Sequence, residues 1–227
     1  MLKKIIYDIT PFTTTDYKDH LSCIAWFITC NMRCPYCYNP DIVNCKCGNY
    51  SVDDLITFLK KRVGLLDGVV LSGGEATNHN LIPICEEIKK LKFKIKLDTN
   101  GSNPKLVKKL VDLHLIDYIA LDYKATDEKF NTITNLKSNK NFIETLTFLI
   151  DSKFDFEVRT TIHPDLLNEN DINCIILDLK EKNYQGVYYL QKYLDVEKTL
   201  GSINKPKQIF NKALLHKEII PLEFRNW

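Results

Sequence analysis

From Leu21 onward, short apolar runs rich in β-branched residues alternate with amphipathic helical patterns, and this alternation limits the possible folds more than any other feature. Such a rhythm is typical of α/β proteins with a mainly parallel sheet. Four stretches carry apolar residues at helical spacing, at 52–63, 81–88, 104–111 and 172–179. The predicted strands are 21–29, 68–71, 94–97, 118–121, 155–162 and 186–192.

Two of the predicted helices also carry start signals. Ser51 followed three residues later by Asp54 forms the pattern of a capping box. Asn103 and Pro104 are typical of an N-cap and a first helical position. These signals place the helix starts at 52 and 104.

The strand "FDFEVRTTI" (154–162) alternates strictly between apolar and polar residues. One face is therefore apolar and the other strongly polar, which favours a barrel with a wet or ligand-filled interior. Six βα units are fewer than the eight of a closed barrel. We predict an α/β fold, a partial (β/α)6 TIM-like barrel with an open side.

The 227-residue chain is long enough for one full core, and we expect a domain over 1–193 with a C-terminal extension, 194–227, packed on it. Apolar residues make up 44% of the chain, but no run reaches the eighteen that a membrane span needs, and the N-terminus is too polar for a signal peptide. The 31 basic and 29 acidic residues are scattered. We expect a cytoplasmic protein that binds neither membrane nor nucleic acid.

Three cysteines, Cys30, Cys34 and Cys37, lie in a C-x3-C-x2-C run directly after the first predicted strand. Without an export signal they should be reduced thiols, suited to metal binding. Three thiolates can ligate three irons of a cubane cluster and leave the fourth iron open. The alternative is a structural zinc site on Cys34 and Cys37 together with Cys45 and Cys47, which would leave Cys30 unused.

Polar clusters follow three further strands: "SGGE" (72–75), "DTNG" (98–101) and "DYK" (122–124). Because ligands in such folds bind beyond the carboxyl ends of the strands, these clusters and the cysteine loop are expected on one rim. Taken singly, "SGGE" also fits a tight turn into a helix, and "DYK" also fits a solvated strand end. Their convergence is the more specific signal.

These motifs together resemble the radical S-adenosylmethionine superfamily. "TPFTTTDY", "CNMRCPYCYNPDIV", "GLLDGVVLSGGEAT", "KLDTNGSNP", "DYIALDYKA" and "EVRTTIHPDLL" are more specifically similar to activating proteins of anaerobic (class III) ribonucleoside-triphosphate reductases, in a longer variant. Thr29 and Ala76 depart from the usual glycine and proline, and "CKC" (45–47) is an insertion. The resemblance covers roughly residues 9–193.

The resemblance implies a 4Fe-4S cluster on Cys30, Cys34 and Cys37, with S-adenosylmethionine on the fourth iron. Reductive cleavage would give a 5'-deoxyadenosyl radical that takes a hydrogen from a glycine of the anaerobic reductase. The electron would come from a donor such as flavodoxin or ferredoxin. The alternatives are a radical enzyme acting on another glycyl-radical protein or a small molecule, and a non-catalytic zinc or iron–sulfur module.

Further residues are assigned to the cosubstrate by the same resemblance. Gly73 and Gly74 would let it approach the backbone, and Glu75 would bind its ammonium group. Asp98 and Asp122 would need a counter-charge from Lys124 or a monovalent cation. Arg159 lies on the polar face of its strand and would therefore face the cosubstrate carboxylate, the partner protein's loop, or a buried acidic partner, Glu157 or an aspartate. The remaining predicted contacts are Tyr36, Thr99, Asn100 and, as a weaker ribose contact, Gln191.

Overall fold

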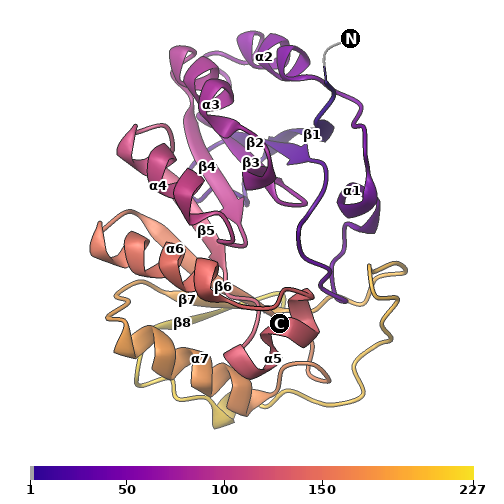
Figure 1. The fold of residues 1–227 in the computed structure, drawn as a ribbon, viewed down its shortest axis with the longest axis vertical. Helices are drawn as coiled ribbons and strands as arrows, with labels where there is room; N and C mark the ends of the chain where they lie inside the picture. Colours follow the sequence, from indigo (N-terminus) through magenta and orange to yellow (C-terminus); the bar gives the residue numbers. More distant parts are fainter. Residues whose placement is uncertain (1–2) are drawn as a thin grey trace. The chain divides into compact units, whose positions relative to one another are not determined.

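The computed structural model describes residues 3–227 and contains one eight-stranded sheet in which the strands follow in chain order (Figure 1). All six predicted strands are present, as β2 to β7. The strands are β1 (Ile6–Thr13), β2 (Ser22–Phe27), β3 (Gly68–Gly73), β4 (Lys94–Thr99), β5 (Tyr118–Asp122), β6 (Phe156–Ile162), β7 (Tyr188–Lys192) and β8 (Leu222–Arg225).

The two edge strands are additions to the predicted set. β1 pairs antiparallel with β2, with a register shift between Thr10 and Thr13, next to Pro11. A proline is tolerated there because edge strands and bulges do not need every backbone donor. β8 pairs parallel with β7 and has only four residues, too few to show a periodic pattern.

The predicted helices are confirmed, and their start signals act as expected. Ser51 and Asp54 exchange hydrogen bonds at the start of α2, and the Asn103 side chain accepts from Leu106 at the start of α4, where Pro104 is the first residue. The sequence patterns missed α1, α5 and α6. The α-helices are α1 (Pro40–Asn44), α2 (Val52–Lys60), α3 (Leu81–Lys90), α4 (Pro104–Asp112), α5 (Asp127–Thr134), α6 (Lys140–Asp151) and α7 (Glu169–Glu181), with short 3-10 turns η1 (Ala76–Asn78) and η2 (Lys212–Leu214).

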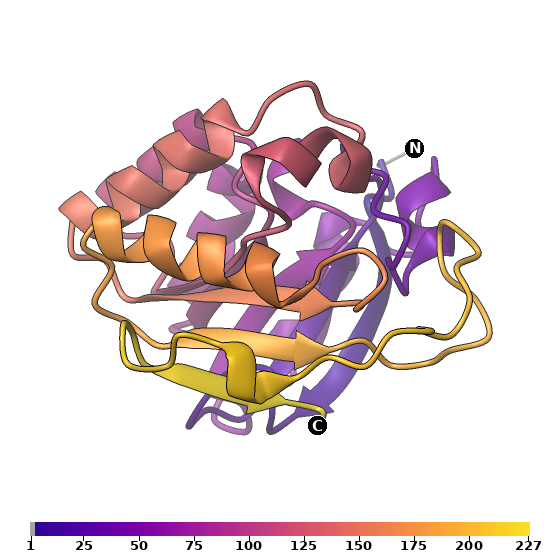
Figure 2. The same cartoon turned by 90° about the horizontal axis from the view of Figure 1, so that it is seen from below.

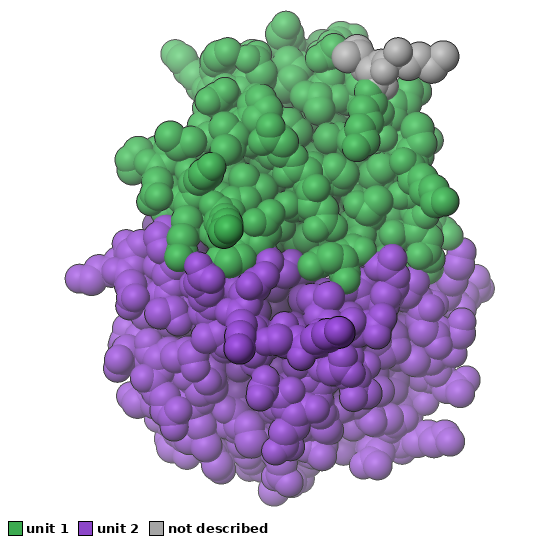
Figure 3. Space-filling view, in the orientation of Figure 1, with its two compact units in different colours: residues 1–31, 39–99, 103–120 green, residues 32–38, 100–102, 121–227 purple. Residues whose placement is uncertain are grey.

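The chain divides into two compact units, drawn in different colours in Figure 3. The first consists of the residues up to Asn31, 39–99 and 103–120, and its core includes the fully buried strand residues Val69, Val70 and Leu71. The second consists of 32–38, 100–102 and 121–227. Its core includes the fully buried Leu190 of β7 and Ile176 of α7, which runs beside β6 and β7 (Figure 2).

Between residues 3 and 227, none of the helices has both the length and the apolar character that crossing a bilayer requires.

Candidate functional site

The cysteine loop follows β2 and is divided between the units. Cys30 belongs to the first unit, whereas Cys34 and Cys37 belong to the second. In the second unit the Arg33 N–H donates to the Thr134 carbonyl at 2.9 Å, and the Cys37 N–H donates to the Cys34 carbonyl at 3.0 Å. Among residues 3–227, no three His, Cys, Asp or Glu side chains form a group that could hold a metal ion. Cluster binding by the three thiols therefore stays a prediction.

Two side chains of this loop are buried beside a lysine. Burial raises the pKa of the Cys34 thiol, and the nearby Lys124 ammonium opposes this rise. Tyr36 is also buried, and its side chain interacts with the Cys34 thiol. Soft thiolates are the ligands that iron–sulfur clusters take, so the donor set of this loop fits such a cluster.

Gly73 and Gly74 are required by the protein backbone itself. A Cβ at Gly73 would lie 2.4 Å from the Phe27 backbone nitrogen and oxygen, and Gly73 has a φ of 118°. A Cβ at Gly74 would lie 2.0 Å from the Thr29 carbonyl oxygen. The close approach of the chain after β2 is therefore enough to explain the two glycines, and their predicted contact with the cosubstrate stays a prediction.

Glu75 is buried and serves as a structural acceptor. Its Oε1 accepts hydrogen bonds from the Thr77 hydroxyl at 2.6 Å and from the Thr99 hydroxyl at 2.7 Å. The Thr77 N–H donates to the same oxygen at 3.2 Å, which caps η1. The end of β3 and the end of β4 are thus joined through one carboxylate oxygen. The structure brings the predicted residues Glu75 and Thr99 together.

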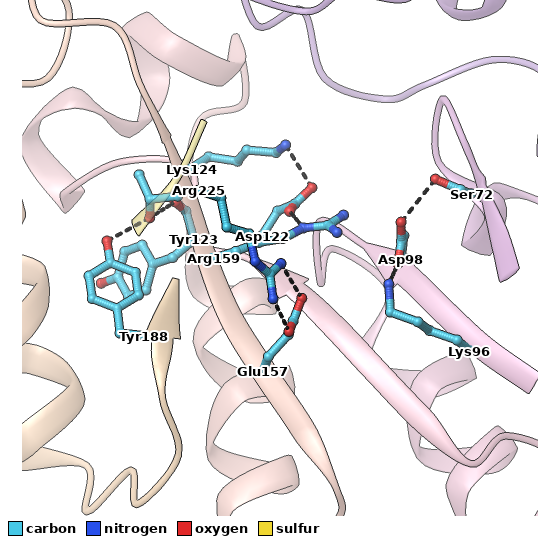
Figure 4. A network of polar contacts seen from close by, with 11 residues as sticks. Ser72, Lys96, Asp98, Asp122, Tyr123, Lys124, Glu157, Arg159, Tyr188 and Arg225 are labelled. Carbon is cyan, nitrogen blue, oxygen red and sulfur yellow. Dashed lines mark hydrogen bonds and ion pairs between the residues drawn. The ribbon is translucent and has the colours of Figure 1, made fainter. Parts of the chain in front are cut away.

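Asp98, at the end of β4, has a partner that the sequence patterns missed. The Lys96 ammonium lies 2.6 Å from Asp98 Oδ1, and the Ser72 hydroxyl donates to Oδ2 at 3.1 Å (Figure 4). The Lys96 side chain is only 5% exposed, so this ion pair is largely shielded from water. Residues two apart on a strand share a face, which is the signal that could have identified Lys96.

Asp122, at the end of β5, lies between two cations. Arg159 Nε is 2.5 Å from its Oδ1 and Lys124 Nζ is 2.9 Å from its Oδ2 (Figure 4). Burial alone would raise the pKa of Asp122, but Arg159 and Lys124 outweigh it and lower the pKa from 3.8 to about 2. The same contacts hold the pKa of Lys124 well above its ordinary value against the effect of burial. Of the two alternatives for Arg159, the pairing with an aspartate is present.

Glu157 has a different partner, which the sequence analysis did not identify. Arg225 of β8 donates two hydrogen bonds to the Glu157 carboxylate in a bidentate pair, from Nη1 to Oε1 at 3.0 Å and from Nη2 to Oε2 at 2.9 Å. The Arg225 guanidinium also lies over the Tyr189 ring, 3.6 Å from the centroid. Arg225 is 68 positions from Glu157 in the sequence. Only the pairing of β7 with β8 shows that the two are neighbours.

The remaining predicted residues, Asn100 and Gln191, lie on different segments of the chain. Asn100 is buried, and its side-chain oxygen accepts from the Ser102 N–H at 3.0 Å within the turn after β4. Gln191 lies on β7, opposite Arg225 in the register with β8. A cavity of about 510 Å³ in the second unit is lined by residues of the C-terminal segment, among them Leu194, Phe210 and Trp227, and by none of the predicted site residues.

Comparison with solved structures identifies the fold class first. A Streptococcus suis SuiB structure bound to S-adenosylmethionine matches with a TM-score of 0.69 at 15% identity, over 88% of this chain and 48% of that chain. This chain therefore spans about half the length of SuiB. The likeness confirms the predicted α/β fold, a partial barrel. The Radical SAM superfamily model matches residues 25–174. The chain belongs to this superfamily.

Curated relatives narrow the comparison. "Putative glycyl-radical enzyme activating enzyme MJ1227" of Methanocaldococcus jannaschii is 28% identical over 217 residues, which cover 91% of this chain and 88% of that protein. The pyruvate formate-lyase-activating enzyme of Streptococcus mutans is 28% identical over 155 residues, which cover 63% of this chain and 59% of that protein. The chain is thus homologous, at low identity, to glycyl-radical enzyme activating enzymes.

Proposed function

We propose that this protein is a glycyl-radical activase whose partner is an anaerobic ribonucleoside-triphosphate reductase. The observation that carries the proposal is the C-x3-C-x2-C loop inside the region matched by the superfamily model. The homology to activating enzymes supports a glycyl-radical protein as the partner. SuiB has also been solved bound to its precursor peptide, so a protein of this fold binds a polypeptide.

Cys30, Cys34 and Cys37 would hold the 4Fe-4S cluster. When reduced and bound with S-adenosylmethionine, this group supplies a 5'-deoxyadenosyl radical able to take a hydrogen atom from a glycine α-carbon. The chain's own residues bind and orient. Cys34 lies in a buried environment that excludes water, and Tyr36 is buried beside it.

Lys124 and Arg159 would recognise the carboxylate of S-adenosylmethionine. Both side chains contact the Asp122 carboxylate, and an ammonium and a guanidinium are the groups that form charge-assisted hydrogen bonds to a carboxylate ligand. Asp98 has its own ammonium from Lys96. A monovalent cation near the two aspartates stays a prediction.

The experiment is an anaerobic reconstitution with iron and sulfide, followed by addition of reductant, S-adenosylmethionine and the reductase from the same organism. Electron paramagnetic resonance should show a glycyl radical on the reductase that is absent with Cys34→Ala and retained with Cys45→Ala. If 5'-deoxyadenosine forms without a glycyl radical, the enzyme acts on another substrate. If the protein binds zinc without acid-labile sulfide, the radical chemistry is wrong.

A further inference from the structure

The segment that follows β7, residues 193–208, makes backbone contacts with the cysteine loop. The Leu200 N–H donates to the Cys37 carbonyl at 2.9 Å, and the Gly201 N–H donates to the Pro35 carbonyl at 2.9 Å. Figure 2 shows this segment leaving the end of β7 as a long loop before the chain returns to β8. We call residues 193–208 the strap.

Gly201 allows the strap to approach the loop this closely. A Cβ at this position would lie 2.5 Å from Pro35 Cβ and 2.7 Å from Pro35 Cα. Cβ atoms do not approach a backbone or a proline ring to this distance, so any other residue would push the strap away. The two hydrogen bonds at 200 and 201 therefore depend on the missing side chain at 201.

Tyrosine contacts extend the strap's attachment to the residue that follows Cys37. The Leu194 N–H donates to the Tyr38 hydroxyl at 2.7 Å. The rings of Tyr38 and Tyr193 stack with their centroids 5.6 Å apart. The loop is therefore held at Cys37, the last predicted cluster ligand, and at its neighbours Pro35 and Tyr38.

The far end of the strap is fixed to the loop after β6. His163 Nε2 lies 3.0 Å from the Asn204 carbonyl oxygen, an acceptor, so Nε2 carries the proton. The Asp165 carboxylate accepts from the backbone N–H groups of Lys207 and Gln208, at 3.0 Å and 2.9 Å in its shorter contacts. A segment anchored at both ends can hold the loop at its middle in a fixed position.

We infer that the strap positions the cysteine loop for cluster binding, with Gly201 as the positioning residue. This inference rests on the proposed function, because it assigns the loop to a cluster. Leu200 and Gly201 contact the loop through their backbone N–H groups, which fix the carbonyls on either side of Tyr36. The strap therefore constrains the backbone from which Cys34 and Cys37 project.

The test compares Gly201→Val and the milder Gly201→Ala with Glu197→Val, which changes an exposed residue of the same strap. In the metal-free protein, hydrogen exchange measured by NMR reports the amides of Leu200 and Gly201. Because a hydrogen bond is worth about 1 kcal/mol and a tenfold change corresponds to about 1.4 kcal/mol, we expect exchange at position 200 to accelerate roughly fivefold in Gly201→Val. After anaerobic reconstitution and gel filtration, this variant should retain less iron and sulfide than wild type, Gly201→Ala should be intermediate, and Glu197→Val should match wild type.

Circular dichroism and the exchange of β6 and β7 amides show whether the fold is intact, and Gly201→Ala is used for the test if Gly201→Val is misfolded. The inference is wrong if the Leu200 amide exchanges freely in wild type, or if a folded Gly201 variant loses the protection yet retains iron and sulfide like wild type. A wild-type protein that binds no iron and sulfide would contradict the proposed function instead. The exchange data would still show whether the strap holds the loop.

Discussion

Two aspartates at strand ends, Asp98 and Asp122, have similar positions in the sequence pattern but different surroundings. Asp98 accepts a hydrogen bond from the Ser72 hydroxyl and forms an ion pair with Lys96 of the same strand. Asp122 contacts two cations, Arg159 at one carboxylate oxygen and Lys124 at the other. The difference teaches that a carboxylate at a strand end can pair with a lysine of its own strand or can hold together two cations from different segments of the chain.

The largest expected effect is the loss of stability in Asp122→Asn. This variant leaves Arg159 and Lys124 shielded from water without their carboxylate, and breaking such a group costs about 3–5 kcal/mol. Asp98→Asn is the matched comparison, because it removes the carboxylate of the ion pair with Lys96. Urea unfolding should give a larger loss for Asp122→Asn. Equal losses in the two variants would remove the distinction between the sites.

A smaller effect is expected in the dependence of the free energy of unfolding on pH below pH 5. The pKa of Asp122 is about 2 in the folded protein and 3.8 ordinarily, so its carboxylate stabilises the fold above pH 3.8, and this contribution is lost as the pH falls toward 2. The shift corresponds to about 2 kcal/mol. The free energy of unfolding, measured from pH 5 to pH 2, should therefore decrease less steeply with falling pH in Asp122→Asn than in wild type. Parallel curves for the two proteins would show that Asp122 does not cause the loss of stability of the wild-type protein in acid.

Ser72→Ala should have the smallest effect of the three. It removes the hydroxyl that donates to Asp98 but leaves Lys96 in place. A single neutral hydrogen-bond donor is worth about 1 kcal/mol in the free energy of unfolding. Urea unfolding of Ser72→Ala alone and combined with Asp98→Asn would measure this coupling. If the two losses add fully, the Ser72 hydroxyl and Asp98 do not interact.

Periodicity and capping signals predicted much of the fold because they are local. The capping box at Ser51 and the proline start at 104 were confirmed as hydrogen-bonded helix starts. β8 was missed because its four residues pair with residues that lie 34 positions earlier in the chain, and no local pattern encodes that. Helices α5 and α6 were missed although their apolar faces are buried.

The candidate site was predicted less completely, for a physical reason. Residue types at strand ends predicted Asp98, Asp122 and Lys124, because ligands in such folds bind beyond the carboxyl ends of the strands. Arg159 was predicted from the alternating pattern of its strand. Lys96 was missed since a lysine within a strand usually faces solvent, and only the structure shows it buried. The strap was missed because its contacts use backbone groups, which every residue has, and Gly201 is their only trace in the sequence.

The hydrogen bonds of the Glu75 carboxylate reduce the conformational entropy that this side chain could lose on binding a ligand. One of its oxygens accepts three hydrogen bonds, two from Thr77 and one from Thr99, in a buried setting. The side chain therefore occupies one rotamer before any ligand arrives. A glutamate ordinarily gives up more than 1 kcal/mol of rotamer freedom when it is immobilised. At Glu75 this loss is already part of folding, so a cation that meets the carboxylate finds a preorganised partner.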